Sequence, residues 1–429
     1  MRAELYVLSL VEFFERLAFG AVLPLFALYL QEHLGHSEAS AIALSSGFLA
    51  AAYLASLPGG FIADHLVGAV GALALGAILI ATGFVGLAAD HSGAFWPAIV
   101  ALLLGQGLVK PSMSTLVGSL YHAHDPRREA GFSIFYVAIN LGALSGPLVS
   151  EWARAGWGWR SIFVCAATAM LPALLLLIAA RGALGRRADH APRTLGAASN
   201  KDDRSRFHAL FLISGVAVIF WLAFQQTGAS LAFFAQAHTV RRVGFLRWSL
   251  PLRPGHFAAL HAGLVIVFTP LELWAFGRLR QRRAEPSAAL KMIWGFLFTA
   301  AAFAIVAGAS LCGGDTGRVS PLWLLSFYAF LSLGELLLSP MGLSLVTELA
   351  PPRFSGCFTG LWFVAIAIGH GLAAALGPFW RDWPHHRYFA LMALLLLGAA
   401  GVILVRLQVL ELLLSRTKHA DEPRQTASG

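Results

Sequence analysis

Charged residues are scarce in this sequence. Asp, Glu, Lys and Arg make up 12% of its 429 residues, whereas soluble domains typically carry about 25%. So few charges cannot cover a soluble globule of 45.8 kDa, because much of the hydrophobic 58% of the chain would then face water. The composition therefore excludes an ordinary soluble domain and predicts a chain embedded in lipid.

Cysteine is also rare, and the sequence has no catalytic or metal-binding motif. Cys165, Cys312 and Cys357 lie far apart in or beside apolar runs, which favours small buried hydrophobes over a disulfide or metal site. No nucleophile elbow or phosphate-binding loop stands in a suitable context. We therefore expect no enzymatic activity and no cofactor.

The excess of positive charge does not indicate nucleic-acid binding. The formal net charge is +9, but the basic residues lie in short clusters between apolar segments. Membrane proteins distribute basic residues in this way, because their loops carry them. We therefore expect a lipid bilayer, and no nucleic acid, as a partner.

Long apolar runs recur along the chain. The runs at 67–89, 160–180, 292–311 and 388–410 contain no charged residue except at their ends. Crossing a hydrocarbon core of about 30 Å takes roughly 20 apolar residues in a helix. The sequence thus predicts twelve transmembrane helices, near 5–30, 38–62, 67–89, 94–121, 131–152, 160–180, 208–236, 257–278, 290–312, 320–348, 356–379 and 386–410.

A polar segment near the midpoint divides these helices into two sets of six. The pattern predicts an N-terminal half at 1–180, a basic linker at 181–207, a C-terminal half at 208–410 and a tail at 411–429. Most of the 31 Lys and Arg residues fall on the side of the linker, so both termini and the linker are expected in the cytoplasm. The first apolar run continues past Pro24 without a cleavage site, which indicates a retained helix rather than a signal peptide.

The first predicted helix carries three charges, and the fourth carries one. Glu12, Glu15 and Arg16 share a helical face through their spacing of three and four residues. Arg16 can neutralise only one of the two carboxylates, and Lys110 can supply a second cation. A carboxylate whose ionisation depends on a nearby lysine is a candidate proton-coupling switch. The alternative is a purely structural ion cluster that joins two helices.

Several motifs resemble those of one transporter family. Glu12-Phe-Phe-Glu15-Arg16 resembles the ExxER signature of the proton-dependent oligopeptide transporters, within the major facilitator superfamily. The segments at 59–68, 105–144 and 333–373 resemble that family's loop between helices 2 and 3, its helices 4 and 5, and its helices 10 and 11. The resemblance implies an all-α integral membrane bundle of twelve helices in two six-helix halves.

The resemblance also implies roles for particular residues. Proton coupling would fall to Glu12, Glu15, Arg16 and Lys110. The peptide pocket would include Tyr53, Asn140, Glu335 and Trp362, with Glu335 holding the peptide's amino terminus. The alternative is interhelical hydrogen bonding for Tyr53 and Asn140, and packing or an interface anchor for Trp362.

This chain departs from the family's pattern where the peptide carboxylate would bind. The family usually has a second arginine at the position of Leu23 and a glutamate at that of Gln225. Losing only one of an opposed pair would leave a buried charge unpaired, so their joint replacement is chemically coherent. Histidines occupy two positions where the family tends to have asparagine. His261 could accept a proton or hold a carboxylate, or it could be a neutral imidazole that replaces an amide hydrogen bond; for His370 we favour the neutral imidazole.

These observations predict a proton-coupled symporter that imports di- and tripeptides across the inner (plasma) membrane. Its partners would be protons and a small peptide or peptide-like substrate, and we expect a monomer. A transporter of the same fold for another small zwitterion, organic acid or drug stays open because of Leu23 and Gln225. A non-transporting sensor is the third reading, although costly intramembrane charges are hard to explain in a protein that moves nothing.

Overall fold

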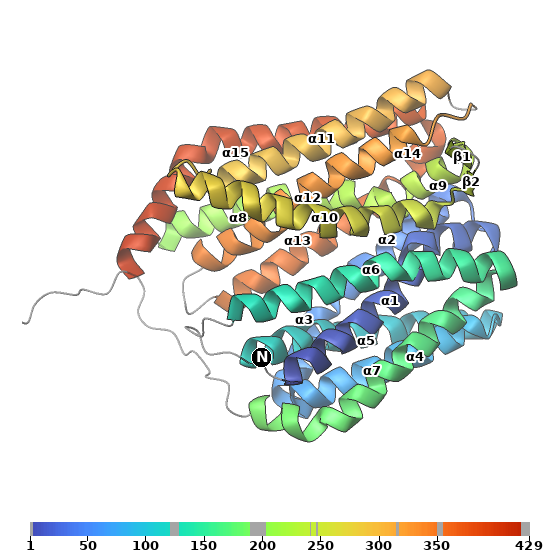
Figure 1. Ribbon diagram of the computed structural model, residues 1–429, viewed down its shortest axis with the longest axis horizontal. Coiled ribbons are helices and arrows are strands. Elements are labelled where there is room, and N and C mark those ends of the chain that lie inside the picture. The colour runs from blue at the N-terminus through green and yellow to red at the C-terminus, as the bar shows by residue number, and fades with distance from the viewer. Residues whose placement is uncertain are drawn as a thin grey trace, which may run out of the picture.

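Long α-helices make up nearly all of the described chain. The computed structural model describes residues 3–120, 128–188, 203–240, 242–245, 248–314, 317–349 and 355–421. The helices lie side by side in two groups, one from each half of the sequence (Figure 1). Backbone amides and carbonyls must be paired inside the hydrocarbon core, so long helices suit a chain this apolar.

The N-terminal group is built around the first helix, which packs against α6 and α7, while α4 packs against α5 and α7. The short helix η1 is a π-helical turn. The elements of this group are α1 (Ala3–Glu32), α2 (Glu38–Leu54), α3 (Ser56–Ile62), η1 (Ala63–Val67), α4 (Gly68–Ala88), α5 (Ser92–Ser119), α6 (Arg128–Trp157) and α7 (Trp159–Ala188).

In the C-terminal group α11 packs against α12 and α15, and α8 packs against α13 and α15. The strands β1 and β2 form an antiparallel hairpin with Arg242 opposite Pro251. The elements are α8 (Asp203–Phe224), η2 (Gln225–Gly228), α9 (Ser230–Ala237), β1 (Arg242–Phe245), β2 (Trp248–Pro251), α10 (Pro254–Gln281), α11 (Ala288–Gly313), α12 (Leu322–Leu349), α13 (Ser355–Ala375), α14 (Gly377–Asp382) and α15 (His385–Asp421).

The described helices include 11 stretches long and apolar enough to cross a membrane. One of them, Glu38–Ala88, has 51 residues, which is enough for two passes at roughly 20 residues each. The helical conformation is interrupted within this stretch at Gly68, where φ is +73°. The part before the break packs against α13 and the part after it against α5 and α7. Counting this stretch twice gives the twelve passes that the sequence predicts.

The helices extend into the predicted linker from both sides. Helix α7 continues to Ala188 and α8 begins at Asp203. Residues 189–202 of the predicted linker and 422–429 of the predicted tail lie outside the described part of the chain.

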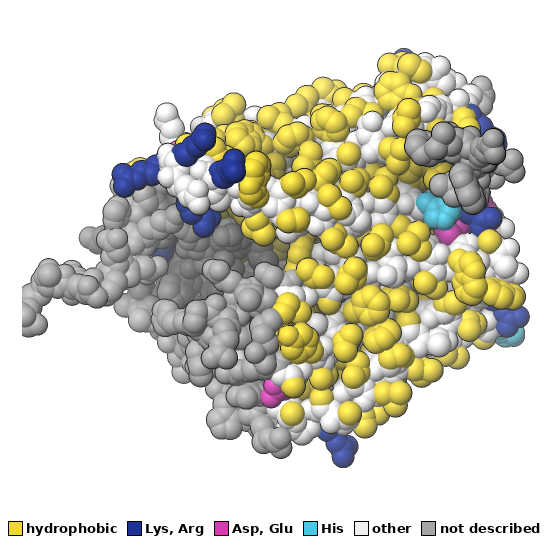
Figure 2. Space-filling view, viewed as in Figure 1, with side chains coloured by type: hydrophobic (Ala, Val, Ile, Leu, Met, Phe, Trp, Pro, Cys, Tyr) yellow, Lys and Arg dark blue, Asp and Glu magenta, His cyan; other side chains and the backbone are white. Residues whose placement is uncertain are grey.

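Apolar side chains cover the flanks of the bundle. In Figure 2 they form a broad surface across the middle of the molecule, whereas Lys and Arg gather near its two ends. Leu175, Leu394 and Val405 are among the large hydrophobic residues with most of their surface exposed. A surface of this kind is stable against lipid tails and unstable in water.

Small residues allow some helices to approach closely. A methyl group built at Gly59 of α3 would overlap the carbonyl oxygen of Gly107 in α5. Helices in membranes commonly associate through such glycine contacts, because lipid provides no hydrophobic driving force between them. The contact fixes α3 against α5, the helix that carries Lys110.

Candidate functional site

A cavity of about 270 Å³ lies between the two helix groups. Helices α1, α2 and α6 line it from the N-terminal half, and α8, η2, α10, α12 and α13 line it from the C-terminal half. Its lining includes three of the predicted substrate-binding residues, Tyr53, Gln225 and His261. A site formed by both halves near the middle of a bundle is the usual location of the substrate in transporters of this architecture.

The predicted charged cluster on α1 reaches this cavity through Arg16. Arg16 lines the cavity, and its guanidinium donates to both carboxylate oxygens of Glu15, with an Nη2–Oε1 distance of 2.7 Å. The Nε atom of Arg16 also lies 3.1 Å from Oε1 of Glu12. Both carboxylates are buried, Glu15 almost completely. One guanidinium therefore contacts two carboxylates, as the helical spacing predicted.

Lys110 lies close to this cluster but contacts an aromatic ring. Its Nζ atom is 3.4 Å from the centre of the Tyr53 ring on α2, and a cation above an aromatic face is attracted by the negative charge of the π system. Among the described side chains, the ammonium forms no ion pair with either carboxylate of α1. The proximity of Lys110 to the cluster was predicted, and its contact with Tyr53 was not.

On the other side of the cavity a histidine pairs with Glu335, the carboxylate that was predicted to bind the substrate. The Nε2 atom of His261, on α10, lies 2.8 Å from Oε2 of Glu335, on α12. The Nδ1 atom of the same ring lies 2.8 Å from the hydroxyl of Ser332. The side chain of Glu335 retains 25% exposure, and its partner His261 lines the cavity.

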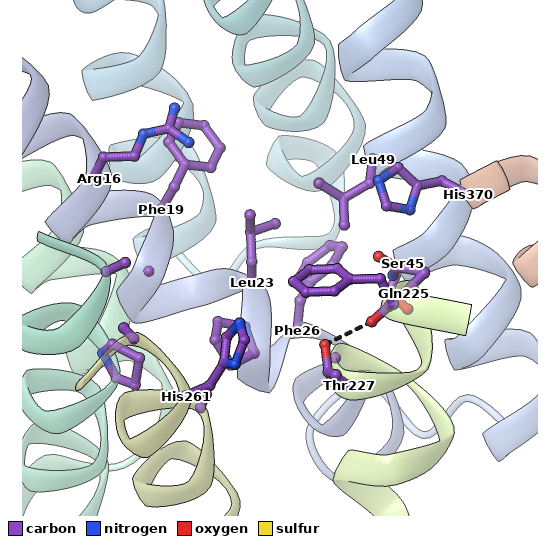
Figure 3. A pocket seen from close by; sticks show the side chains of 18 of the residues that line it. Arg16, Phe19, Leu23, Phe26, Ser45, Leu49, Gln225, Thr227, His261 and His370 are labelled. Carbon is purple, nitrogen blue, oxygen red and sulfur yellow. Dashed lines mark hydrogen bonds between the residues drawn. The ribbon is translucent and has the colours of Figure 1, made fainter. Parts of the chain in front are cut away.

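His370 reaches the cavity from α13, across Leu23 from His261 (Figure 3). Its ring lies 5.5 Å from that of Tyr53 and 6.1 Å from that of Trp221. The residue is 3% exposed, and its Nδ1 atom has no hydrogen-bond partner within the described chain. A buried, unpaired ring nitrogen next to a cavity is available to a ligand or to water.

The other predicted pocket residues make mainly interhelical or local contacts. The amide of Gln225 donates to the hydroxyl of Ser46 at 3.3 Å, which joins η2 to α2. The amide of Asn140 donates to the carbonyl of Tyr136 at 2.9 Å within α6. Trp362 is buried against Gly342 of α12. The lining that the structure describes for the cavity does not include Asn140, Glu335 or Trp362.

Two polar residues that were not predicted complete the site. Gln106 is buried and donates its amide to Oε1 of Glu15. Ser332 bridges His261 to the backbone of α12. Gln106 precedes Lys110 by four residues and therefore shares its helical face, which was a usable signal in the sequence. Nothing in the sequence distinguishes Ser332 from other helical serines.

A further buried carboxylate joins the two helix groups at the end of the bundle that carries β1 and β2. Glu151 of α6 is 1% exposed and accepts a hydrogen bond of 2.9 Å from the backbone N–H of Gly255 in α10. Its Oε2 atom lies 3.7 Å from Arg154 and 3.8 Å from Arg253. A methyl group at Gly255 would lie 2.6 Å from Cγ of Glu151. We call Glu151, Arg154, Arg253 and Gly255 the end cluster.

Two further hydrogen bonds join the halves at this end. The amide of Gln236 donates to Glu32 at 2.8 Å, and the indole N–H of Trp380 donates to Glu38 at 2.8 Å. Together with the end cluster they hold the two groups of helices in contact beyond the cavity.

A cavity between two six-helix halves, next to a buried ion cluster, defines a secondary transporter of the major facilitator type. The POT family profile matches residues 70–187 and 188–389 of the chain. The peptide transporter YePEPT of Yersinia enterocolitica subsp. palearctica serotype O:3 is 31% identical over 86% of each chain. The chain belongs to the POT family.

Other comparisons agree over nearly the whole chain. Dipeptide and tripeptide permease A of Cronobacter turicensis is 26% identical, over 98% of this chain and 94% of that protein. The crystal structure of a mutant peptide transporter POT in complex with alafosfalin superposes with a TM-score of 0.87 at 28% identity, covering 96% of this chain and 95% of the other. The predicted family and fold are therefore confirmed.

Proposed function

We propose that this protein is a proton-coupled symporter that imports small peptides, chiefly di- and tripeptides, by alternating access. Three observations support the proposal: membership of the POT family, relatives named as peptide transporters, and a cavity that both halves line. The observation that carries it is the cavity with Arg16 on one side and His261, the partner of Glu335, on the other.

In this proposal Glu335 holds the amino group of the peptide. A carboxylate in a cavity of low dielectric is stable only beside a cation, and an ammonium ligand supplies one. The apolar and aromatic lining, with Leu23, Phe26, Phe224 and Trp221, would accept the peptide side chains.

The charged cluster on α1 would couple the peptide to the proton. Glu15 accepts hydrogen bonds from two nitrogens of Arg16 and from Gln106, whereas Glu12 shares one of those Arg16 nitrogens. Glu12 is therefore the carboxylate that loses least on accepting a proton. Protonation would release part of the hold on Arg16 and let α1 move against α5 and Lys110.

We further propose that the protein lies in the inner membrane as a monomer, with both termini cytoplasmic. The distribution of Lys and Arg in the sequence supports this orientation. The end cluster would then lie on the outer side, and the peptide would leave the cavity toward the linker side.

Uptake into liposomes under an imposed pH gradient tests the proposal. We expect the wild type to accumulate dialanine, and Glu12→Gln or Lys110→Ala to abolish gradient-driven accumulation while the protein still folds. Glu285→Gln, in the loop after α10, is the control and should transport normally. Wild-type accumulation in both site variants would show that the cluster does not couple transport.

A second candidate is a transporter of the same fold for another small solute. Leu23 and Gln225 line the cavity where the family's arginine and glutamate would stand, so a firm grip on a peptide carboxylate is missing. The same liposomes, given a panel of zwitterions, organic acids and amines, separate the two candidates. Uptake of one of these solutes without any uptake of peptides would establish the second.

A further inference from the structure

The proton positions in the His261 pair follow from its hydrogen bonds. The hydroxyl of Ser332 lies 2.8 Å from the carbonyl oxygen of Tyr328, one helical turn earlier in α12. The hydroxyl also lies 3.4 Å from the carbonyl oxygen of His261. Carbonyl oxygens only accept, so the single hydroxyl proton of Ser332 points to one of these two carbonyls. The hydroxyl oxygen must then accept from Nδ1 of His261, 2.8 Å away. The Nδ1 atom of His261 therefore carries a hydrogen.

The contact with Glu335 needs one more proton. The Nε2 atom of His261 and Oε2 of Glu335 are 2.8 Å apart, and neither an unprotonated ring nitrogen nor an ionised carboxylate oxygen can donate. One proton must lie between them, on the nitrogen as an imidazolium or on the oxygen as a carboxylic acid. In both cases the pair is neutral as a unit and holds one proton more than a neutral histidine beside an ionised glutamate.

An amino group that binds Glu335 competes for the same oxygen atoms. A ligand ammonium brings its own positive charge and donors to the carboxylate. With the ammonium and the shared proton both present, this partly buried site would carry a net positive charge, so the pair gives up the shared proton and His261 keeps the one on Nδ1. The proton leaves through the cavity to water, and the pair retains its neutral charge with the ligand in place.

We propose that His261 is the resident counter-ion of Glu335, and that each amino group bound there displaces one proton from the pair. This inference rests on the proposed function, in which Glu335 receives the amino group of the ligand. His261 is thus a specificity-determining residue: it admits ligands whose cationic group outcompetes an imidazolium and disfavours ligands without one. The displaced proton is distinct from the proton that α1 would carry.

The surroundings of His261 contain few competing charges. Helix α10 packs against α1, α6, α9 and α12, and α9 has no ionisable residue. The ionisable residues of α10 and its other neighbours include Glu335 and Tyr328 on α12, Tyr136 and Glu151 on α6, His256 and Glu272 on α10, and the Glu12–Glu15–Arg16 cluster on α1. Tyr136 and, from α2, Tyr53 interact electrostatically with Glu335. Among them only Glu335 makes an ion pair with His261 in the described chain.

Calorimetry in two buffers of different ionisation enthalpy measures the displaced proton directly. Purified protein in detergent is titrated with dialanine, and the difference in apparent enthalpy gives the number of protons released per peptide. We expect the wild type to release about one proton more than His261→Asn at a pH where the pair is loaded. The dialanine affinity of the wild type should correspondingly rise with pH by up to tenfold per unit more steeply than that of the variant.

A matched histidine provides the control. His33 and Asp90 form the same imidazole–carboxylate contact, at 2.8 Å, on the exposed surface. The variant His33→Asn should release as many protons on binding dialanine as the wild type. A second comparison needs no substitution: N-acetyl-dialanine lacks the ammonium, so any residual binding to the wild type should release no proton from the pair.

The outcomes separate this inference from the proposed function. If neither dialanine nor any other small peptide binds or is taken up, the proposed function fails. If dialanine binds and His261→Asn releases the same number of protons as the wild type, the inference is overturned while the proposed function stands. If His261→Asn does not fold, equal proton release by dialanine and its acetylated form in the wild type overturns the inference.

Discussion

Removing the carboxylate of Glu151 should open the bundle at the end cluster. The residue is 1% exposed and lies at the contact between α6 and α10, which belong to different halves. If the halves separate at this end during transport, the interactions of Glu151 with α10 exist only in the closed state. The substitution Glu151→Ala therefore destabilises that state relative to the open one.

The size of the effect follows from the interactions that the carboxylate makes. The hydrogen bond from the N–H of Gly255, at 2.9 Å, is charge-assisted and contributes about 1.5–3 kcal/mol. The ion pair with Arg253 of the other half, at 3.8 Å, is long and adds at most about 1 kcal/mol. The pair with Arg154, at 3.7 Å, lies within α6 and is kept in both states. A total of about 3 kcal/mol corresponds to roughly a hundredfold shift in the ratio of open to closed molecules.

Labelling of a cysteine in the cavity measures this shift. Thr227 lines the cavity, so Thr227→Cys is introduced after the three native cysteines have been replaced by serine. A thiol reagent that does not cross membranes is added on the side of the end cluster. We expect the labelling rate to rise by one to two orders of magnitude with Glu151→Ala, because the open state that exposes the thiol becomes more populated.

A second substitution and a control test the reasoning. Gly255→Ala should also raise the labelling rate, since its methyl group would lie 2.6 Å from Cγ of Glu151. Glu285→Ala, in the loop between α10 and α11, should leave the rate unchanged. Rates within twofold of the parent for both Glu151→Ala and Gly255→Ala, in folded protein, would refute the closing role of the end cluster.

Two further predictions concern stability in detergent. Gly107→Ala should lower the free energy of unfolding by about 1–3 kcal/mol, because the added methyl group would lie 2.5 Å from the carbonyl oxygen of Ala55; Gly398→Ala, in open space, should be neutral or slightly stabilising, and equal melting temperatures would contradict the packing argument. Hydrogen bonds from Arg280 and Lys291 lower the pKa of Glu285 to about 2, so its contribution is present above the unfolded pKa of about 4.3 and lost as pH falls toward 2. Over that pH range the free energy of unfolding should fall less for Glu285→Gln than for the wild type. The difference should be less than about 1 kcal/mol, because Glu285 is a surface group.

The helices were predictable because the membrane fixes their length. The expected helix at 290–312 corresponds to α11, Ala288–Gly313, and the expected helix at 94–121 to α5, Ser92–Ser119. The start of α11 is set by Ser287, whose side chain accepts from the N–H of Leu290, and such caps are visible in the sequence. The length of the apolar runs and the local capping residues were together enough to predict where these helices begin and end.

The break after α8 could not be predicted in the same way. The expected helix at 208–236 is divided by η2, Gln225–Gly228. Gln226 is fully buried there and accepts hydrogen bonds from Ser230 and from Tyr388 of α15. Tyr388 is 162 residues away along the chain, so this partner follows from the tertiary fold and not from local pattern. The hairpin of β1 and β2 was likewise not predicted.

In the candidate site, too, contacts within one helix were predictable and contacts between distant segments were not. The spacing of Glu12, Glu15 and Arg16 within one helix predicted their contact, and the structure agrees. Contacts between distant segments were beyond the pattern: Gln106 is 91 residues from Glu15. The pairing of His261 with Glu335 also joins two helices, although each residue had been selected separately. The functional roles of these residues stay predictions.

The break at Gly68 bears on how the chain is threaded into the membrane during synthesis. Its backbone, at φ +73° and ψ 158°, lies in a region that is essentially restricted to glycine and costs other residues about 1–3 kcal/mol. A nascent chain that failed to reverse there would insert the apolar stretch as one long segment. That segment would cross the bilayer once instead of twice, and every later loop would then face the wrong compartment. The sidedness of every helix after α3 thus depends on a reversal at one residue without a side chain.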